Sequence, residues 1–150
     1  MTVRFELHPT LARDGFTVGD LPLSHVLLMN DERFPWFILV PRRPNIREVY
    51  ELSQADRILL QDEIAYFGES LMKALSGNKL NVAALGNQVP QLHVHLVVRF
   101  HHDAAWPNPI WCQGAPEPMT ETTQKTRMEI GQAIIRQLIA QHDQRAVPKP

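Results

Sequence analysis

Five short apolar runs recur along the chain and predict strands. They lie at residues 3–7, 24–30, 36–42, 79–85 and 91–100. The polar segment "NDERFP" separates the second run from the third, and the turn "GNQVP" separates the fourth from the fifth. Each of these pairs is therefore expected to form a hairpin. The segment "HPTLARDG" at 8–15 is turn-prone and is expected to follow the first strand.

A helical periodicity covers residues 53–77, where apolar positions recur every three or four residues. Ser53 followed by Asp56 is a variant of the capping box, and Gly77 with Asn78 is expected to stop the helix. The apolar stripe of this helix is Leu60, Ile64, Phe67, Leu71 and Leu75.

A second helix is expected from Thr120, as its cap, through about Gln141, and the tail at 147–150 is expected to fray. The order strand, hairpin, helix, hairpin, helix predicts an α+β fold, with an antiparallel sheet of about five strands and two main helices. Because 150 residues suffice for one core, residues 1–150 are expected to form a single domain.

Composition narrows the classes of protein without naming one. The apolar share of 44% and the charged share of 21% are those of an ordinary globular protein. A formal net charge of -1 gives no basic footprint for extended nucleic-acid binding. No apolar run approaches the ~18 residues that span a membrane, and residues 1–15 lack the pattern of a signal peptide. With Cys112 as the single cysteine, no intramolecular disulfide is expected, and the default location is cytoplasmic.

The candidate chemistry lies in "PQLHVHLVVRF" at 90–100. Side chains alternate faces along a strand, so Gln91, His93 and His95 share one face with Val97 and Arg99, while the other face is wholly apolar. The two imidazoles are expected ~6–7 Å apart along the strand. In the preceding turn, Gly86 allows close backbone approach, and Asn87 and Gln88 offer uncharged hydrogen-bond donors that suit an oxyanion.

Three interpretations of this pair remain open from the residues alone. His93 and His95 can be buried polar residues with carbonyl partners, or part of a metal site completed by His101, His102 or Asp103. They can also be a nucleophile and its helper, since a neutral imidazole attacks phosphorus well. We favour the third interpretation, because the metal ligands would have to come from beyond the strand end.

The motif "QLHVHLVV" resembles the signature of the histidine triad (HIT) superfamily of nucleotide hydrolases and transferases, in which three histidines alternate with apolar residues. The resemblance extends over roughly residues 20–110 and includes the early "ILVP" hairpin, the long helix and the polar turn. "GNQVPQLHVH", followed by "RF" and "AWP", is similar to bacterial HIT-like proteins described as diadenosine-tetraphosphate-hydrolase-like.

The resemblance implies roles for individual residues. His93 would attack the α-phosphate of a nucleotide and form a nucleotidyl-phosphohistidine, and His95 would contact phosphate oxygens and assist the leaving group. Asn87 and Gln88 match a turn that contacts phosphate, and Asn30 matches a residue that contacts the ribose. No metal is expected in the protein, although polyphosphate substrates are expected to arrive with Mg²⁺. The family also implies a homodimer.

Two departures from the family pattern stand near the proposed nucleophile. Gln91 replaces the first histidine, and it cannot titrate near pH 7. Trp36-Phe37 replaces the usual Gly-His before the "LV" strand. The favoured function is a hydrolase of phosphoanhydrides or phosphoramidates, acting on nucleotides or dinucleoside polyphosphates. The alternatives are a nucleotide-binding or regulatory protein with weakened catalysis, and a small metalloprotein.

The remaining candidates are aromatic and basic. Trp106 and Trp111 flank "PNPI" and are expected either to cover the site and stack on a base or to pack within their own loop. Arg99 is expected in a structural ion pair, with a phosphate clamp as the alternative, and His101 and His102 are expected at the surface. Arg42 and Arg43 are expected to be solvated turn charges, with a role in holding distal phosphates as the alternative.

Overall fold

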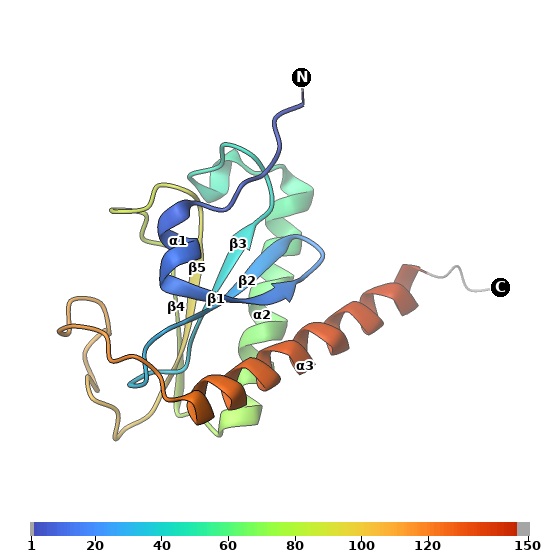
Figure 1. The fold of residues 1–150 in the computed structure, drawn as a ribbon. Helices are drawn as coiled ribbons and strands as arrows, with labels where there is room; N and C mark the ends of the chain where they lie inside the picture. Colours follow the sequence, from blue (N-terminus) through green and yellow to red (C-terminus); the bar gives the residue numbers. More distant parts are fainter. Residues whose placement is uncertain (1, 147–150) are drawn as a thin grey trace.

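The computed structural model describes residues 2–146, so the tail predicted to fray lies outside it. These residues form a five-stranded sheet in which each neighbouring pair is antiparallel, in the order β1-β2-β3-β5-β4 (Figure 1). The strands are β1 (Gly15–Asp20), β2 (Ser24–Met29), β3 (Trp36–Pro41), β4 (Lys79–Ala83) and β5 (Val94–Arg99). The predicted fold class, an antiparallel α+β sheet with two main helices, is confirmed.

The strand predicted at 3–7 is wrong, because residues 2–8 have no regular secondary structure. The turn-prone segment after it instead contains α1 (Pro9–Asp14) and leads into β1. His8 caps α1 with its ring, since Nδ1 accepts a hydrogen bond from the amide of Thr10 at 3.1 Å. Proline at the first helical position needs no amide donor, which favours a helix start there. The weakly apolar sequence of β1 gave no strand signal.

The histidine strand begins later than its pattern predicts. β5 starts at Val94, so the loop from β4 runs over 84–93 and not over the five residues of "GNQVP". The amide of Leu92 donates to the carbonyl of Ile46 at 2.9 Å, outside the sheet. Pro90 has no amide donor for a ladder. His93 therefore stands immediately before the first residue of the strand.

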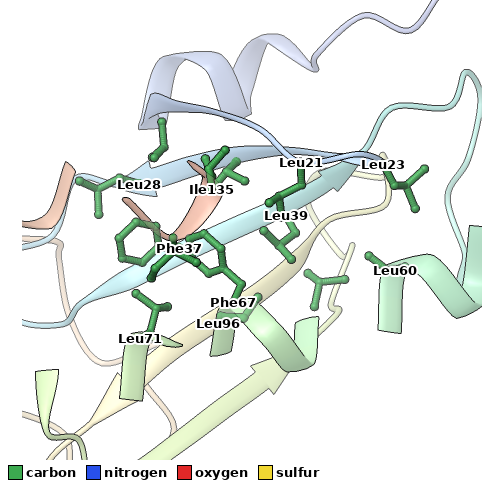
Figure 2. Close-up of a cluster of buried hydrophobic side chains, with 14 of the residues drawn as sticks. Leu21, Leu23, Leu28, Phe37, Leu39, Leu60, Phe67, Leu71, Leu96 and Ile135 are labelled. Atoms are coloured by element: carbon green, nitrogen blue, oxygen red, sulfur yellow. The ribbon is translucent and has the colours of Figure 1, made fainter. Parts of the chain in front are cut away.

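Two long helices pack on one face of the sheet. α2 (Gln54–Leu75) starts where predicted, with Ser53 accepting from the amide of Asp56, and stops through Ser76 in the left-handed conformation, one residue before Gly77. Figure 2 shows the core that α2 shares with the strands, in which Phe37 meets the edge of Phe67 with ring centroids 5.4 Å apart. The apolar face predicted for the histidine strand packs in this core.

The second helix, α3 (Glu121–Ala146), continues five residues beyond the predicted end at Gln141 and projects away from the sheet (Figure 1). Its contact with the sheet is close, because a Cβ on Gly131 would lie 2.8 Å from the ring of Phe37 and 2.9 Å from Val18. A short 3₁₀ helix, Val49–Glu51, precedes α2. No helix within residues 2–146 combines the length and apolarity needed to cross a membrane.

One buried carboxylate joins α2 to the sheet. Glu63 is 1% exposed, and its two oxygens accept hydrogen bonds from the amides of Leu23 at 2.8 Å and Ser24 at 3.0 Å. Burial raises the pKa of Glu63 despite these hydrogen bonds. The start of β2 therefore depends on a side chain from the middle of a helix.

We expect Glu63→Gln to lower the free energy of unfolding by about 1–3 kcal/mol, because an amide nitrogen would face one of the two backbone donors and leave it unpaired. Urea denaturation followed by circular dichroism measures this loss. Glu69→Gln is the matched control on the same helix, since its side chain is 68% exposed and forms an ion pair with Lys73 at the surface. Equal stabilities for the two variants would contradict the prediction.

Candidate functional site

His93 and His95 lie together on the sheet face that α2 and α3 leave free. Their ring centroids are 4.9 Å apart with the planes at 66°, and the residues are 7% and 6% exposed. β5 lies between β3 and β4, and His95 stands opposite Ile38 on one side and Ala83 on the other. The alternation read from the sequence thus brings the two imidazoles together, at the start of an interior strand.

The ring of His93 is oriented by the main chain. Its Nδ1 lies 2.6 Å from the carbonyl oxygen of Gln91. A carbonyl only accepts, so Nδ1 carries the proton and donates. In the neutral ring, Nε2 then holds the free lone pair, and this is the nitrogen that can act as a nucleophile.

The ring of His95 has the opposite tautomer. The indole Nε1 of Trp36 lies 2.9 Å from Nδ1 of His95. An indole nitrogen only donates, so Nδ1 accepts and the proton of the neutral ring is on Nε2. Burial, reinforced by His93, lowers the pKa of His95 to about 3. The site therefore presents one nucleophilic nitrogen and one neutral N–H donor side by side.

The side chain of Gln91 points away from this pair and holds the N-terminal segment. Its Nε2 donates to the carbonyl of Glu6 at 2.8 Å, and its Oε1 accepts from the amide of His8 at 2.8 Å. Only the main-chain carbonyl of Gln91 reaches His93. A glutamine suits this task because its amide donates and accepts at once.

The two tryptophans of the loop after β5 have different environments. The rings of Trp111 and His95 form a T-shaped pair with centroids 5.4 Å apart. Trp106, the sequence candidate for substrate contact, packs against His101 at 4.8 Å and lies 5.7 Å from the guanidinium of Arg99. Trp111, and not Trp106, is therefore the loop residue against the histidine pair. Sequence gave no means of choosing between them, because both flank the same "PNPI".

The other polar candidates are spread around the pair. Asn87 and Gln88 are exposed in the loop before β5, where Gly86 has a positive φ of 75°. Asn30 follows β2, and its Oδ1 accepts from the amide of Met119 at 2.8 Å, fastening the segment before α3. Asn30 thus makes a long-range contact within the chain, whereas the side chains of Asn87 and Gln88 face solvent.

The arginines singled out in the sequence bind carboxylates and carbonyls. Arg99 is 1% exposed and forms the predicted ion pair, with Asp103 at 2.7 Å. Arg43 pairs with Asp56 at 2.7 Å, and Arg42 donates to three main-chain carbonyls, contrary to the expectation of solvated turn charges. These contacts explain the positions of the arginines without any bound phosphate.

The residues considered as additional metal ligands are either exposed or bound to other groups of the chain. His101 and His102 are exposed, as predicted, and Asp103 is taken up by Arg99 and by backbone amides, which hold its pKa at about 2. Within residues 2–146 no three His, Cys, Asp or Glu side chains gather as a metal-binding group.

An antiparallel α+β sheet with paired histidines at the start of an interior strand is the arrangement of a histidine triad protein, and the comparisons agree. A family model described as HIT domain matches residues 11–102. The chain therefore belongs to the HIT family. No curated protein matches it.

Three solved structures show the same fold over nearly the whole chain. A histidine triad protein from Marinobacter aquaeolei VT8 is 46% identical and covers 91% of this chain and 99% of its own, with a TM-score of 0.87. One from Bradyrhizobium japonicum is 40% identical and covers 89% of this chain and 99% of its own, with a TM-score of 0.86. One from Sinorhizobium meliloti 1021 is 43% identical and covers 86% of this chain and 96% of its own, with a TM-score of 0.83.

The Gln91 contacts predict a local effect. Gln91→Ala should weaken protection of the His8 amide against hydrogen exchange by roughly five- to tenfold, because that amide loses its acceptor, worth about 1 kcal/mol. Exchange measured by NMR checks this. Gln88→Ala, an exposed glutamine of the same loop, should leave the His8 amide unchanged. Equal exchange in both variants would contradict the assigned role of Gln91.

The depressed pKa of His95 predicts a pH-dependent stability. The unfolded chain protonates this ring near the ordinary value of 6.5, whereas the folded chain protonates it only near 3. Stability contributed by His95 is thus complete above about pH 6.5 and falls as pH drops, by up to about 1.4 kcal/mol per unit. Urea denaturation from pH 7 to pH 4 should show a shallower decline for His95→Gln; parallel declines would refute the assignment.

Proposed function

We propose that the protein is a nucleotide phosphohydrolase or nucleotidyl transferase that acts through a covalent nucleotidyl-phosphohistidine on His93. The bond cleaved is a phosphoanhydride or phosphoramidate at the α-phosphate. The observation that carries the proposal is the 2.6 Å contact between Nδ1 of His93 and the carbonyl of Gln91, which leaves Nε2 unprotonated. A nucleophile needs such a free lone pair, and the same hydrogen bond fixes the orientation of the His93 ring.

The chemistry divides into two steps. Nε2 of His93 forms a bond to the α-phosphorus, and the bond from phosphorus to the leaving group breaks, with its electron pair departing on that group. The phosphorylated ring becomes positively charged, and the carbonyl of Gln91 stabilises this charge through the Nδ1 proton. Water then attacks the phosphorus, restores the lone pair of Nε2, and releases a proton and the nucleotide.

His95 supports both steps as a hydrogen-bond donor. Its Nε2 proton is directed by the Trp36 contact on the opposite side of the ring. We assign that donor to a phosphate oxygen, where a preorganised N–H lowers the cost of the developing charge. The polar side chains of Asn87 and Gln88 are assigned to the same phosphate group, and Asn30 to the nucleoside. Trp111 takes the nucleoside role expected of Trp106, because Trp111 lies against His95 and Trp106 packs against His101.

The family resemblance supplies the remaining parts of the proposal. The substrate is a nucleotide or a diadenosine-tetraphosphate-like dinucleoside polyphosphate that arrives with Mg²⁺, with no cofactor held by the protein itself. The working assembly is a homodimer located in the cytoplasm. Analytical ultracentrifugation tests the assembly, and omission of Mg²⁺ from the assay tests the ion.

We expect His93→Ala to lower hydrolysis by about a thousandfold or more and to abolish the trapped intermediate, because no other side chain replaces the Nε2 lone pair. The rate of hydrolysis is measured with a panel of dinucleoside polyphosphates and nucleoside phosphoramidates. The intermediate is detected as phosphohistidine by mass spectrometry, without an acid quench.

His101→Ala is the matched control, since His101 is exposed and packs against Trp106 outside the pair. Undiminished hydrolysis by His93→Ala would rule out the covalent mechanism. Micromolar nucleotide binding by the wild-type protein with negligible turnover across the panel would favour the second candidate, a nucleotide-binding or regulatory HIT protein, over the enzyme.

A further inference from the structure

Trp36 reaches His95 from the neighbouring strand β3. It is the first residue of β3 and stands opposite Val97, one pleat from His95 on the same face of the sheet. Its indole packs with two separate apolar clusters, one around Ile38 and one around Phe34. These contacts support the partly buried ring, whose N–H points at Nδ1 of His95 at 2.9 Å.

This contact is compatible with only one state of His95. A protonated His95 carries hydrogens on both nitrogens, so its Nδ1–H would point at the indole N–H, and both donors would lose their partner in a buried site. The groups packed around the ring offer no compensation. His93 is the titratable group that acts on it, and the loop after β5 contributes the uncharged ring of Trp111.

A permanently neutral His95 limits which leaving groups can depart. It can donate its Nε2 proton as a hydrogen bond, but giving the proton away would leave an imidazolate anion in a buried site. A phosphate or nucleotide leaves as a stable oxyanion and needs no proton. An amine leaving from a phosphoramidate must take up a proton as the P–N bond breaks, and His95 in this state has none to supply.

We propose that Trp36 is a positioning residue that, together with burial, holds His95 in its neutral, Nε2-protonated form. This form restricts the enzyme to phosphoanhydrides and disfavours phosphoramidates. This inference rests on the proposed covalent function and narrows its substrate class. In the favoured reaction, the bond from Nε2 of His93 to phosphorus forms while the P–O bond breaks, and the bridging oxygen carries the electron pair away. The atoms and charges balance without a general acid.

The tautomer is tested without substrate. In histidine-¹⁵N-labelled wild-type protein, His95 should show an unprotonated Nδ1 and a protonated Nε2 from pH 8 to pH 5, with its signals assigned by their loss in His95→Gln. In Trp36→Phe the indole donor is gone and the aromatic ring remains, so His95 should titrate at higher pH than in the wild type. A wild-type imidazolium signal above pH 5 would overturn the proposal.

Trp111→Phe is the matched control for this measurement. Trp111 also meets His95, but its Nε1 has no hydrogen-bond partner among the described residues. Removing that N–H leaves the contact from Trp36 intact, so His95 should keep its wild-type tautomer. An identical upward shift in both variants would show that loss of packing, and not loss of the donor, sets the state of His95, and would contradict the proposal.

Kinetics test the substrate restriction. The wild-type kcat/KM should favour a dinucleoside polyphosphate over an adenosine phosphoramidate by about 100-fold or more, the scale of a missing general acid. Trp36→Phe should narrow this ratio at least about tenfold, with a gain in phosphoramidate kcat that grows below pH 7. A wild-type protein that cleaves both classes at similar rates through His93 would contradict the restriction alone. Wild-type protein that cleaves neither class would contradict the proposed function together with the restriction.

Discussion

The pairing of β5 between β3 and β4 is the constraint on which the site depends. It makes the histidine strand an interior strand, with Ile38 and Ala83 as the neighbours of His95 in the two flanking strands. Because Trp36 stands opposite Val97, two residues along from His95, the antiparallel register brings its indole diagonally across to the imidazole. A one-residue slip of this register would turn the indole to the helix-covered face. The same pairing thus provides the burial that keeps His95 neutral and the donor that fixes its tautomer.

The two histidines are controlled by different kinds of partner. His93 is oriented by a main-chain carbonyl, so its geometry is set by the path of the loop at 84–93 and not by the type of side chain at 91. That separation leaves the amide of Gln91 free to bind Glu6 and His8 and to hold the N-terminal segment. His95 is oriented by a side chain, Trp36, and so depends on residue identity. The two departures read from the sequence therefore differ in their contacts: the side chain of Gln91 does not bind His93, whereas the side chain of Trp36 binds His95.

Periodicity predicted much of the framework because it reports burial directly. The alternation around His93 and His95, the helix bounded by Ser53, and both hairpins follow from which side chains face the core. It failed at residues 3–7, where Phe5 and Leu7 are apolar and partly buried but make no ladder. It also gave no sign of the hydrogen bond between Trp36 and His95, 59 positions apart, because pattern carries no information on the partner of a polar atom. The same limit hid the buried role of Glu63, which resembles any other helix glutamate in sequence.

In the proposed reaction, the N–H group of His95 meets the anionic substrate, and the charges of Arg42, Arg43 and Arg99 do not. Burial keeps His95 neutral and the contact with Trp36 places its proton on Nε2, while Arg99 and Arg43 pair with carboxylates. Arg42 is committed to three main-chain carbonyls. A full charge near the nucleophile would stabilise the bound phosphate as much as the transition state, whereas a neutral N–H gains most as charge develops. In the proposed mechanism, a positive charge appears on His93 when it is phosphorylated, at the ring whose Nδ1 proton binds the carbonyl of Gln91. On this proposal, the reaction itself creates the positive charge, next to the carbonyl oxygen that already binds the Nδ1 proton.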